Sequence, residues 1–287
     1  MFRTLLFIPG NNKRFIEKAM SLDADIICFD LEDSVPLNEK QTAREFVSET
    51  LGKKEDHGNR NVYVRINSYE SGIAMQDLDV IVSDEIDGIV VPKVNNENEV
   101  SHLARRLIEL ERQKAMSKKM GIMASIESAQ GLVNSYSIAT ADLRVKMLVF
   151  GVFDFLNDMG LDYVQDGVEY SFARAKIPID ARAAGIGAID AIWQKVDDKE
   201  GLVRDARTAK RLGYQGKCVI HPNQLEPVAN VFFPSNNEIE WARKVVRALE
   251  ETMEKGKGIG AVTVDGKMVD AAHYRQAKSV LDSLDNK

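Results

Sequence analysis

Two carboxylates occupy corresponding places in two neighbouring segments of the chain, Glu127 and Asp154. Glu127 follows the alternating apolar run Gly121–Ile126, and Asp154 ends the apolar run that begins at Lys146. Each run has the pattern of a buried strand, and a helix is expected after each. If the strands are parallel neighbours, carboxylates at their C-terminal ends can share a divalent cation. The alternative is that each carboxylate caps the helix that follows it.

Three more acids, Asp30, Glu32 and Asp33, close the second predicted strand. Mg²⁺ usually takes one or two protein carboxylates and fills its other positions with water and substrate oxygens. We therefore expect Glu127 and Asp154 as direct ligands of Mg²⁺ or Mn²⁺, with the three acids holding metal-bound waters. A turn before the next helix explains Asp33 equally well. The two dispersed cysteines and the unclustered histidines do not favour zinc.

The third predicted strand, Asn61–Asn67, has an aliphatic face and a face that carries Arg65. Val62, Val64 and Ile66 would meet surrounding helices, which leaves Arg65 pointing toward the mouth of a barrel. A guanidinium in that position either neutralises the acidic cluster or holds an oxygen that gains negative charge during a reaction.

Further charged residues have a simple structural explanation beside a functional one. Arg14 and Lys18 lie one helical turn apart, as a phosphate clamp requires, although most such pairs belong to a solvated face. The same caution applies to Lys93, which follows the fourth predicted strand. Asp270 directly precedes the last predicted helix, and its position does not separate an N-cap from a catalytic group.

Eight strand candidates, separated by helical patterns, must position these residues. Their alternation indicates a parallel sheet, and eight repeats favour a (β/α)₈ TIM barrel, of class α/β, over an open doubly wound sheet. No Gly-x-Gly-x-x-Gly follows the first strand, so a dinucleotide site is not indicated. We expect residues 1–234 to form the catalytic barrel. Residues 235–287 predict a helix, a hairpin around Asp265-Gly266 and a closing helix, an extension expected to act as a lid on a neighbouring subunit's active site.

The composition narrows the class of protein further. The 287-residue chain has a net charge of -6 and a pI near 5.4, which argues against nucleic-acid binding. Cys28 and Cys218 lie in separate apolar runs and are expected to be reduced core residues, as suits the cytoplasm. No apolar run approaches the length of a membrane span, and the N-terminal segment is too short for a signal peptide.

Together these motifs resemble the citrate lyase β-subunit-like proteins of the HpcH/HpaI aldolase superfamily, and most of all the stand-alone malyl-CoA and citramalyl-CoA lyases. The similarity is specific at family level because the matching segments run through nearly the whole chain in order. They are Arg3–Gly10, Asp30–Val35 with Lys40 and Ala43-Arg44, Val64–Asn67, Pro92–Val94, Ile126–Ser128, Val149–Gly151 with Asp154, Gly213–Lys217, Ile220–Pro222 and Gly266–Asp270.

The resemblance implies an oligomeric barrel, a trimer or hexamer, that uses Mg²⁺ to cleave or form a carbon–carbon bond in a 3-hydroxyacyl thioester. It also implies a role for each candidate residue. Glu127 and Asp154 would be the metal ligands, Asp30, Glu32 and Asp33 would support the metal waters, and Arg65 would lie beside the substrate carboxylate and thioester oxygen. Arg14, Lys18 and Pro222 would contact coenzyme A, and Asp270 would be catalytic in a neighbouring subunit.

The activity that we expect is cleavage of malyl-CoA or citramalyl-CoA to acetyl-CoA and glyoxylate or pyruvate. The alternatives are a citrate lyase β subunit that acts on a citryl thioester of an acyl-carrier protein, a malate-synthase-like condensation with or without thioester hydrolysis, and a silent CoA- or metal-binding subunit. His221 is more similar to the stand-alone CoA lyases than to citrate lyase β subunits. Phe153 and Phe155 depart from the family pattern, and we expect both to reshape the acyl pocket.

Overall fold

The computed structural model describes residues 2–52, 60–164, 167–254 and 260–285. Contacts divide the chain into a barrel unit, Phe2–Phe232, and a C-terminal unit, Phe233–Lys287. The sequence pattern places this boundary two residues later, after residue 234. Each unit has a hydrophobic core of its own.

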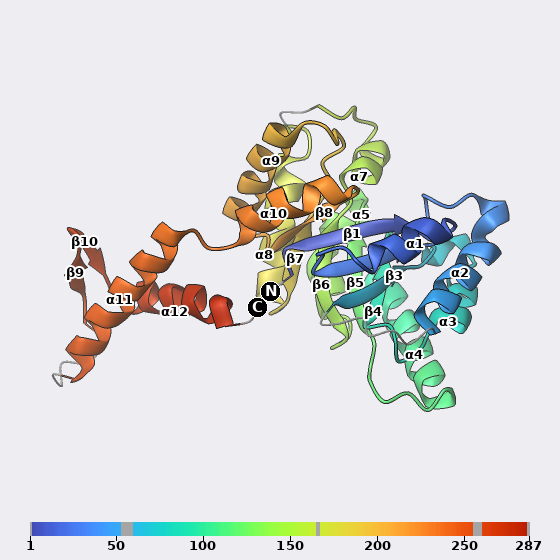
Figure 1. The fold of residues 1–287 in the computed structure, drawn as a ribbon, viewed down its shortest axis with the longest axis horizontal. Helices are drawn as coiled ribbons and strands as arrows, with labels where there is room; N and C mark the ends of the chain where they lie inside the picture. Colours follow the sequence, from blue (N-terminus) through green and yellow to red (C-terminus); the bar gives the residue numbers. More distant parts are fainter. Residues whose placement is uncertain (1, 53–59, 165–166, 255–259, 286–287) are drawn as a thin grey trace. The chain divides into compact units, whose positions relative to one another are not determined.

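Eight parallel strands close into a barrel, in the order of the sequence, with β8 hydrogen-bonded back to β1 (Figure 1). This arrangement confirms the predicted (β/α)₈ fold. The strands are β1 (Thr4–Pro9), β2 (Ile26–Asp30), β3 (Asn61–Arg65), β4 (Gly88–Val91), β5 (Gly121–Ile126), β6 (Val145–Phe150), β7 (Gly187–Asp190) and β8 (Gly216–Val219).

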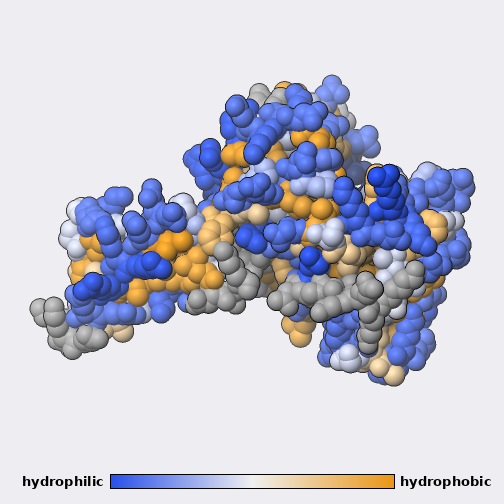
Figure 2. Space-filling model, in the orientation of Figure 1, coloured by the Kyte–Doolittle hydropathy of each residue, from blue (hydrophilic) through white to orange (hydrophobic). Residues whose placement is uncertain are grey.

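Helices follow each strand and cover the outside of the barrel (Figure 1). They are α1 (Lys13–Ala19), α2 (Lys40–Gly52), α3 (Ala74–Ile81), α4 (Glu97–Gln113), α5 (Ala129–Val133), α6 (Ser135–Thr140), α7 (Val152–Met159), α8 (Ser171–Ala183), α9 (Lys199–Leu212) and α10 (Leu225–Phe232), with 3₁₀ turns η1 (Leu37–Glu39), η2 (Tyr69–Ser71) and η3 (Pro222–Gln224). Hydrophilic residues cover much of these helices on the face seen in Figure 2. Among the described residues, none of the helices has the length and apolar character needed to cross a membrane.

Alternate residues of the strands enter two separate hydrophobic clusters. In β3, Val62 and Val64 belong to the cluster shared with the helices, whereas Tyr63 belongs to a second cluster whose buried members all lie on strands. This second cluster fills the interior of the barrel. Arg65 lies two residues beyond Tyr63 and therefore continues the inner face to the C-terminal mouth, as the alternation in the sequence predicts.

A buried group of charged side chains joins the outer side of β7 and β8 to α8 and α9. Lys217 Nζ lies 2.6 Å from Asp190 Oδ2 and 2.5 Å from Asp205 Oδ2. Arg174 binds the same two carboxylates, with Nη2 2.7 Å from Asp190 Oδ2 and Nη1 2.7 Å from Asp205 Oδ1. Two cations and two anions balance one another, which is the condition under which such groups tolerate burial.

The C-terminal unit consists of α11 (Asn236–Glu254), a hairpin of β9 (Val262–Val264) and β10 (Lys267–Val269), and α12 (Ala271–Asp285). This is the predicted helix–hairpin–helix. Ser235 and Glu238 form the capping box, since the backbone N–H of each bonds to the side chain of the other. Asp265 and Gly266 both have positive φ, 46° and 76°, as the tight hairpin turn requires.

The two tryptophans of the chain lie in different units. Trp193 follows β7 and is buried among the apolar residues of the barrel unit. Trp241 lies on α11, where the Lys267 ammonium is 5.2 Å from the centre of its ring. The barrel unit therefore buries one indole ring, and the C-terminal unit partly buries the other.

Candidate active site

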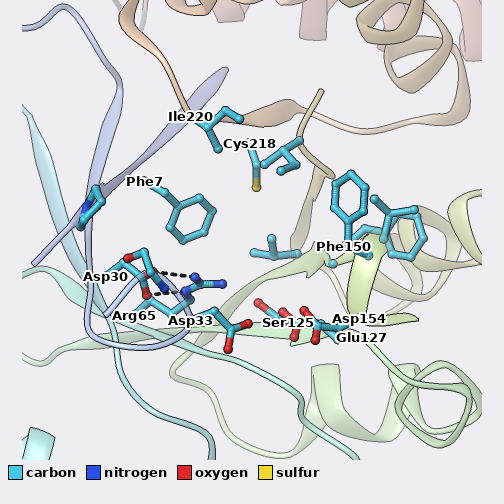
Figure 3. Close-up of a pocket in the computed structure, with 17 residues that line it drawn as sticks. Phe7, Asp30, Asp33, Arg65, Ser125, Glu127, Phe150, Asp154, Cys218 and Ile220 are labelled. Carbon is cyan, nitrogen blue, oxygen red and sulfur yellow. Dashed lines mark hydrogen bonds and ion pairs between the residues drawn. The ribbon is translucent and has the colours of Figure 1, made fainter. Parts of the chain in front are cut away.

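A cavity of about 430 Å³ opens at the C-terminal ends of the barrel strands (Figure 3). Asp30, Arg65, Ser125, Glu127 and Asp154 gather on one side of it in Figure 3. Apolar side chains line the rest of the cavity, including those of Phe150, Cys218 and Ile220, and Phe7 lies next to Arg65. The closed barrel thus brings together acids from β2, β5 and the segment after β6, which are distant in the sequence.

The guanidinium of Arg65 is held on three sides. Asp30 and Arg65 lie opposite each other in the β2–β3 register, and their side chains form a two-point ion pair, with Nε 2.6 Å from Oδ1 and Nη2 2.7 Å from Oδ2. Nη1 lies 3.3 Å from Glu32 Oε2, and the Phe7 ring centre is 4.8 Å from Cζ. Burial raises the pKa of Asp30, but the charge of Arg65 and the hydrogen bonds that Asp30 accepts together outweigh it and leave that pKa below the ordinary value.

Glu127 is a buried carboxylate that the surrounding protein does not fully satisfy. It follows β5 directly and is 5% exposed, and its Oε2 has no hydrogen-bond partner. Burial is the main cause that raises the pKa of Glu127 to about 8; Arg65 opposes this rise, and the Glu32 and Asp154 carboxyls add to it. Gly151 allows this packing, because a Cβ at that position would lie 2.4 Å from Glu127 Cγ.

Asp154 reaches the cavity from a helix and not from a strand. The sixth strand ends at Phe150, and Asp154 lies in the first turn of α7. The prediction that Asp154 ends the sixth strand is therefore wrong, because the strand pattern stops at Gly151, which begins the helix. The first turn still directs the carboxylate to the same cavity as Glu127 (Figure 3).

Lys93 is part of the acidic side of the site, a role that sequence analysis missed. Its Nζ lies 2.6 Å from Glu32 Oε1, 3.1 Å from Asp33 Oδ2 and 3.6 Å from Asp154 Oδ1. Burial lowers the pKa of Lys93, but the Glu32, Asp33 and Asp154 carboxylates together raise it above its ordinary value, so the ammonium stays charged. The backbone at Lys93 has a φ of 52°, which sequence alone does not reveal. The position of Lys93 just after β4 was the feature of the sequence that could have indicated this role.

The residues on the acidic side suit a hard divalent cation. Glu127 has an unpartnered oxygen in a buried site, and Asp154 offers a second carboxylate in the same cavity. In the described parts of the chain no group of three or more His, Cys, Asp or Glu side chains is arranged to hold a metal. Mg²⁺ needs only one or two protein carboxylates, so the donor set fits Mg²⁺ better than zinc.

Three residues predicted to contact coenzyme A, Arg14, Lys18 and Pro222, are not among the described residues that line the cavity. Arg14 and Lys18 are exposed on α1, which follows β1, and Pro222 begins the 3₁₀ turn that follows β8. Phe153 lines the cavity, as expected. Phe155 does not, and the expectation for it is wrong: it is buried on the other face of α7, 5.8 Å from the Phe150 ring.

Asp270 lies in the C-terminal unit and caps α12. Its Oδ1 accepts hydrogen bonds from the backbone N–H of Ala272 at 2.9 Å and of His273 at 3.3 Å. The same oxygen lies 2.8 Å from His273 Nδ1. The hydrogen bonds to His273 and Ala272 lower the pKa of Asp270. The cap is thus formed, and the catalytic role in a neighbouring subunit stays a prediction.

The chain is similar to a known protein family and to several known enzymes along most of its length. A family model described as HpcH/HpaI aldolase/citrate lyase matches residues 3–222. A citrate lyase subunit beta from Leuconostoc mesenteroides subsp. cremoris is 37% identical over 97% of this chain and 92% of its own length. A (3S)-malyl-CoA thioesterase from Cereibacter sphaeroides is 35% identical over 98% and 93%, and the mitochondrial citramalyl-CoA lyase of Rattus norvegicus is 32% identical over 97% and 85%.

A solved structure is similar along almost the whole chain. It is the protein CitE from Mycobacterium tuberculosis in complex with magnesium, acetoacetate and coenzyme A, with a TM-score of 0.78 and 26% sequence identity. The similarity covers 98% of this chain and 97% of that one.

Proposed function

The chain belongs to the HpcH/HpaI aldolase/citrate lyase family, and from this membership we propose that it is a Mg²⁺-dependent carbon–carbon lyase. Its substrate is a 3-hydroxyacyl-CoA thioester of the malyl-CoA or citramalyl-CoA type, and its products are acetyl-CoA and a 2-oxo acid, glyoxylate or pyruvate. The observation that carries this proposal is the buried, unpartnered Glu127 carboxylate beside Asp154 and Arg65 in one cavity.

Glu127 and Asp154 are the proposed ligands of Mg²⁺, and Glu32 and Asp33 orient its water molecules from behind. The relative from Mycobacterium tuberculosis, which contains magnesium and coenzyme A, supports both cofactor assignments. Bound at this pair, Mg²⁺ would polarise the hydroxyl and carboxylate of the malyl-like end of the substrate and lower the pKa of the hydroxyl. Lys93 keeps Glu32 and Asp33 in place through its contacts with both.

Arg65 stabilises the charge that forms on the thioester. Loss of the hydroxyl proton lets the carbon–carbon bond break, and the electron pair moves onto the thioester as an enolate. Burial disfavours the charged form of Arg65, but the Asp30, Glu32 and Glu127 carboxylates together raise the pKa of Arg65 above its ordinary value, so the guanidinium stays charged. A fixed guanidinium next to the enolate oxygen lowers the barrier without reorganisation.

The remaining roles concern the neighbouring subunit and the coenzyme. In the proposed homo-oligomer, the Asp270 carboxylate of one subunit accepts the hydroxyl proton in another subunit's site and then gives it to the enolate carbon, which completes acetyl-CoA. Arg14 and Lys18 bind the coenzyme A phosphates, and Pro222 contacts the coenzyme. The two buried free cysteines support a cytoplasmic location.

The second candidate is a citrate lyase β subunit that cleaves a citryl thioester of an acyl-carrier protein to oxaloacetate. The 37% identity with such a subunit from Leuconostoc mesenteroides favours it. A subunit of this kind would copurify with carrier and transferase partners and would leave free CoA thioesters unchanged.

Mass spectrometry of the products decides between the two candidates. Purified protein is incubated with malyl-CoA, with citramalyl-CoA and with a citryl-carrier thioester, each with Mg²⁺ and with chelator. We expect chelator-sensitive release of acetyl-CoA with glyoxylate or pyruvate, and at least about a 1,000-fold loss of rate in the Glu127→Gln variant. Turnover of the carrier thioester alone would replace the proposed function with the second candidate.

A further inference from the structure

The two sides of the cavity differ in charge, and this difference bears on the substrate. The acidic side carries the carboxyl groups of Asp30, Asp33, Glu127 and Asp154, with Arg65 as the one basic side chain among the described lining residues. Most of the remaining lining is apolar: we name Val149, Phe150, Phe153, Ile192 and Ile220 the apolar wall, while Phe7 lies against the Arg65 guanidinium. Figure 3 shows Phe150 and Ile220 of this wall apart from the acids.

The basic groups near the cavity are already paired. Arg65 uses Nε and Nη2 for Asp30, and its Nη1 lies 3.3 Å from Glu32. Lys93 lies within 3.6 Å of carboxyl oxygens on Glu32, Asp33 and Asp154. Of the two serines in the described lining, Ser34 is next to Asp33 in the chain and Ser125 lies with the acids in Figure 3. No side chain of the apolar wall can pair with an anion.

Resting on the proposed function, we propose that the cavity accepts a 2-oxo acid with one carboxylate and a short apolar tail, and rejects one with a second carboxylate. The single carboxylate and the oxo group take the acidic side, where Arg65 and the cation lie. The tail then faces the apolar wall. A carboxylate in place of the tail would lose water and gain no side-chain partner from the wall.

This selection separates the candidate products by chemistry. Pyruvate has a methyl tail that gains apolar contacts, and glyoxylate has no tail, so pyruvate should bind about fourfold more tightly than glyoxylate, as expected for burial of one methyl group. Oxaloacetate, the product of citryl thioesters, carries the second carboxylate that the wall does not accommodate. The cavity therefore favours a citramalyl-type substrate over a citryl-type substrate.

Binding of a matched pair of acids tests the proposal without any turnover. 2-Oxobutanoate and oxaloacetate have nearly the same shape and differ in a terminal methyl against a terminal carboxylate. We expect titration calorimetry of the intact protein with Mg²⁺ to give at least about 30-fold tighter binding of 2-oxobutanoate than of freshly dissolved oxaloacetate.

A gain-of-charge variant sharpens the test. Ile220 is partly exposed at the wall, so Ile220→Arg should fold and should add a guanidinium there. We expect this variant to lose the preference for 2-oxobutanoate by at least about tenfold, because the second carboxylate gains a partner. Ile179→Arg, at an exposed position of α8 outside the cavity, is the matched control and should keep the wild-type ratio.

Equal binding of the two acids, tighter binding of oxaloacetate, or no binding of 2-oxobutanoate would overturn the inference. An unchanged ratio in Ile220→Arg would do so as well. Thioester cleavage, measured on the same preparation, separates this result from a failure of the proposed function. A protein that cleaves CoA thioesters but prefers oxaloacetate keeps the function and loses the inference.

Discussion

The carboxyl group of Glu127 is buried, has an oxygen without a partner and lies near the carboxyl groups of Glu32 and Asp154. These conditions favour its protonated form, whereas a metal ligand must be ionised. Without a cation, the ionised Glu127 carboxylate therefore destabilises the folded state. With Mg²⁺ bound, the same carboxylate is a metal ligand. This dual character makes it the most informative single position in the site.

The pH dependence of stability follows from the sign of this shift. In metal-free protein the pKa of Glu127 is about 8, above the ordinary 4.5, so the folded state binds the proton more tightly than the unfolded chain. The stabilising contribution is complete below pH 4.5 and is lost as the pH rises through about 8. We compare the free energies of unfolding of the wild type and Glu127→Gln in urea with chelator. Between pH 5 and pH 9 the value for Glu127→Gln should rise relative to that of the wild type by roughly 2–4 kcal/mol.

Mg²⁺ should suppress this loss, because a cation stabilises the carboxylate. The exposed Glu45 serves as the control, since Glu45→Gln should follow the wild-type curve. Parallel curves for wild type and Glu127→Gln would show that Glu127 is an ordinary carboxyl group.

Residues at the site were predictable to different degrees. Arg65 was placed correctly, because the alternation of β3 fixes which face it shares with Tyr63. Lys93 was noted after the fourth strand, but its contacts with Glu32 and Asp154 were not predicted, because its left-handed backbone angle is not encoded in a pattern of apolar residues. Phe155 was misplaced, because the expectation rested on its place beside Asp154 in the chain, whereas on the helix α7 its ring is buried near Phe150 and does not line the cavity.

At the scale of elements, the close approach of β5 and the start of α7 positions the proposed metal ligand. Gly151 has a φ of -104°, which alanine also adopts, so a Gly151→Ala change acts through the added Cβ alone. That Cβ would meet Glu127 Cγ at 2.4 Å and push the carboxylate aside. We expect a loss of Mg²⁺ affinity of at least about tenfold in titration calorimetry, with the fold retained.

Gly52→Ala is the matched control, since a Cβ there would have no neighbour within 4 Å. It should leave the Mg²⁺ affinity unchanged. Wild-type affinity in Gly151→Ala would argue that Glu127 is not a ligand.

Removing a charge from the buried group between β7, β8, α8 and α9 should lower the stability of the protein strongly. Lys217 is fully buried, and its loss would leave Asp190 and Asp205 with Arg174 as the one remaining cation of the group. Lys217→Met should lower the free energy of unfolding by about 3–5 kcal/mol in urea. Lys118→Met, which breaks a partly exposed pair with Asp87, should cost less than about 1 kcal/mol. Similar losses for both would contradict the assignment.

The barrel was predictable from the sequence because eight apolar runs alternate with helical patterns, and such repeats leave few topologies. The helix–hairpin–helix was predictable from its capping box and from Asp265-Gly266. The group around Lys217 was not, since it joins Arg174 to residues up to 43 positions away and depends on the closed packing of four elements.

At the scale of the whole molecule, the proposed catalytic groups are divided between the two units. Glu127 lies in the barrel unit and Asp270 in the C-terminal unit. If Asp270 acts in a neighbouring subunit, Glu127→Ala and Asp270→Ala proteins are each inactive, but coexpressed subunits should assemble oligomers with some complete sites. We expect the mixture to recover at least about 10% of the wild-type rate of acetyl-CoA release.

Asp270→Asn in the same experiment separates capping from catalysis. Asparagine also caps helices, so this variant should keep α12 and its stability while losing turnover. Full activity of Asp270→Asn would leave the residue with a capping role alone. No recovery in folded mixtures would place Asp270 and Glu127 in the same subunit's site.

The placement of Trp193 and Trp241 in different units gives the protein a separate fluorescent reporter for each. In Trp241→Phe the emission comes from the barrel unit alone, and in Trp193→Phe from the C-terminal unit alone. Trp193 is 4% exposed, so its emission should shift to the red when the barrel opens. A denaturant series on the two variants therefore reads out whether the barrel and the extension unfold together or one after the other.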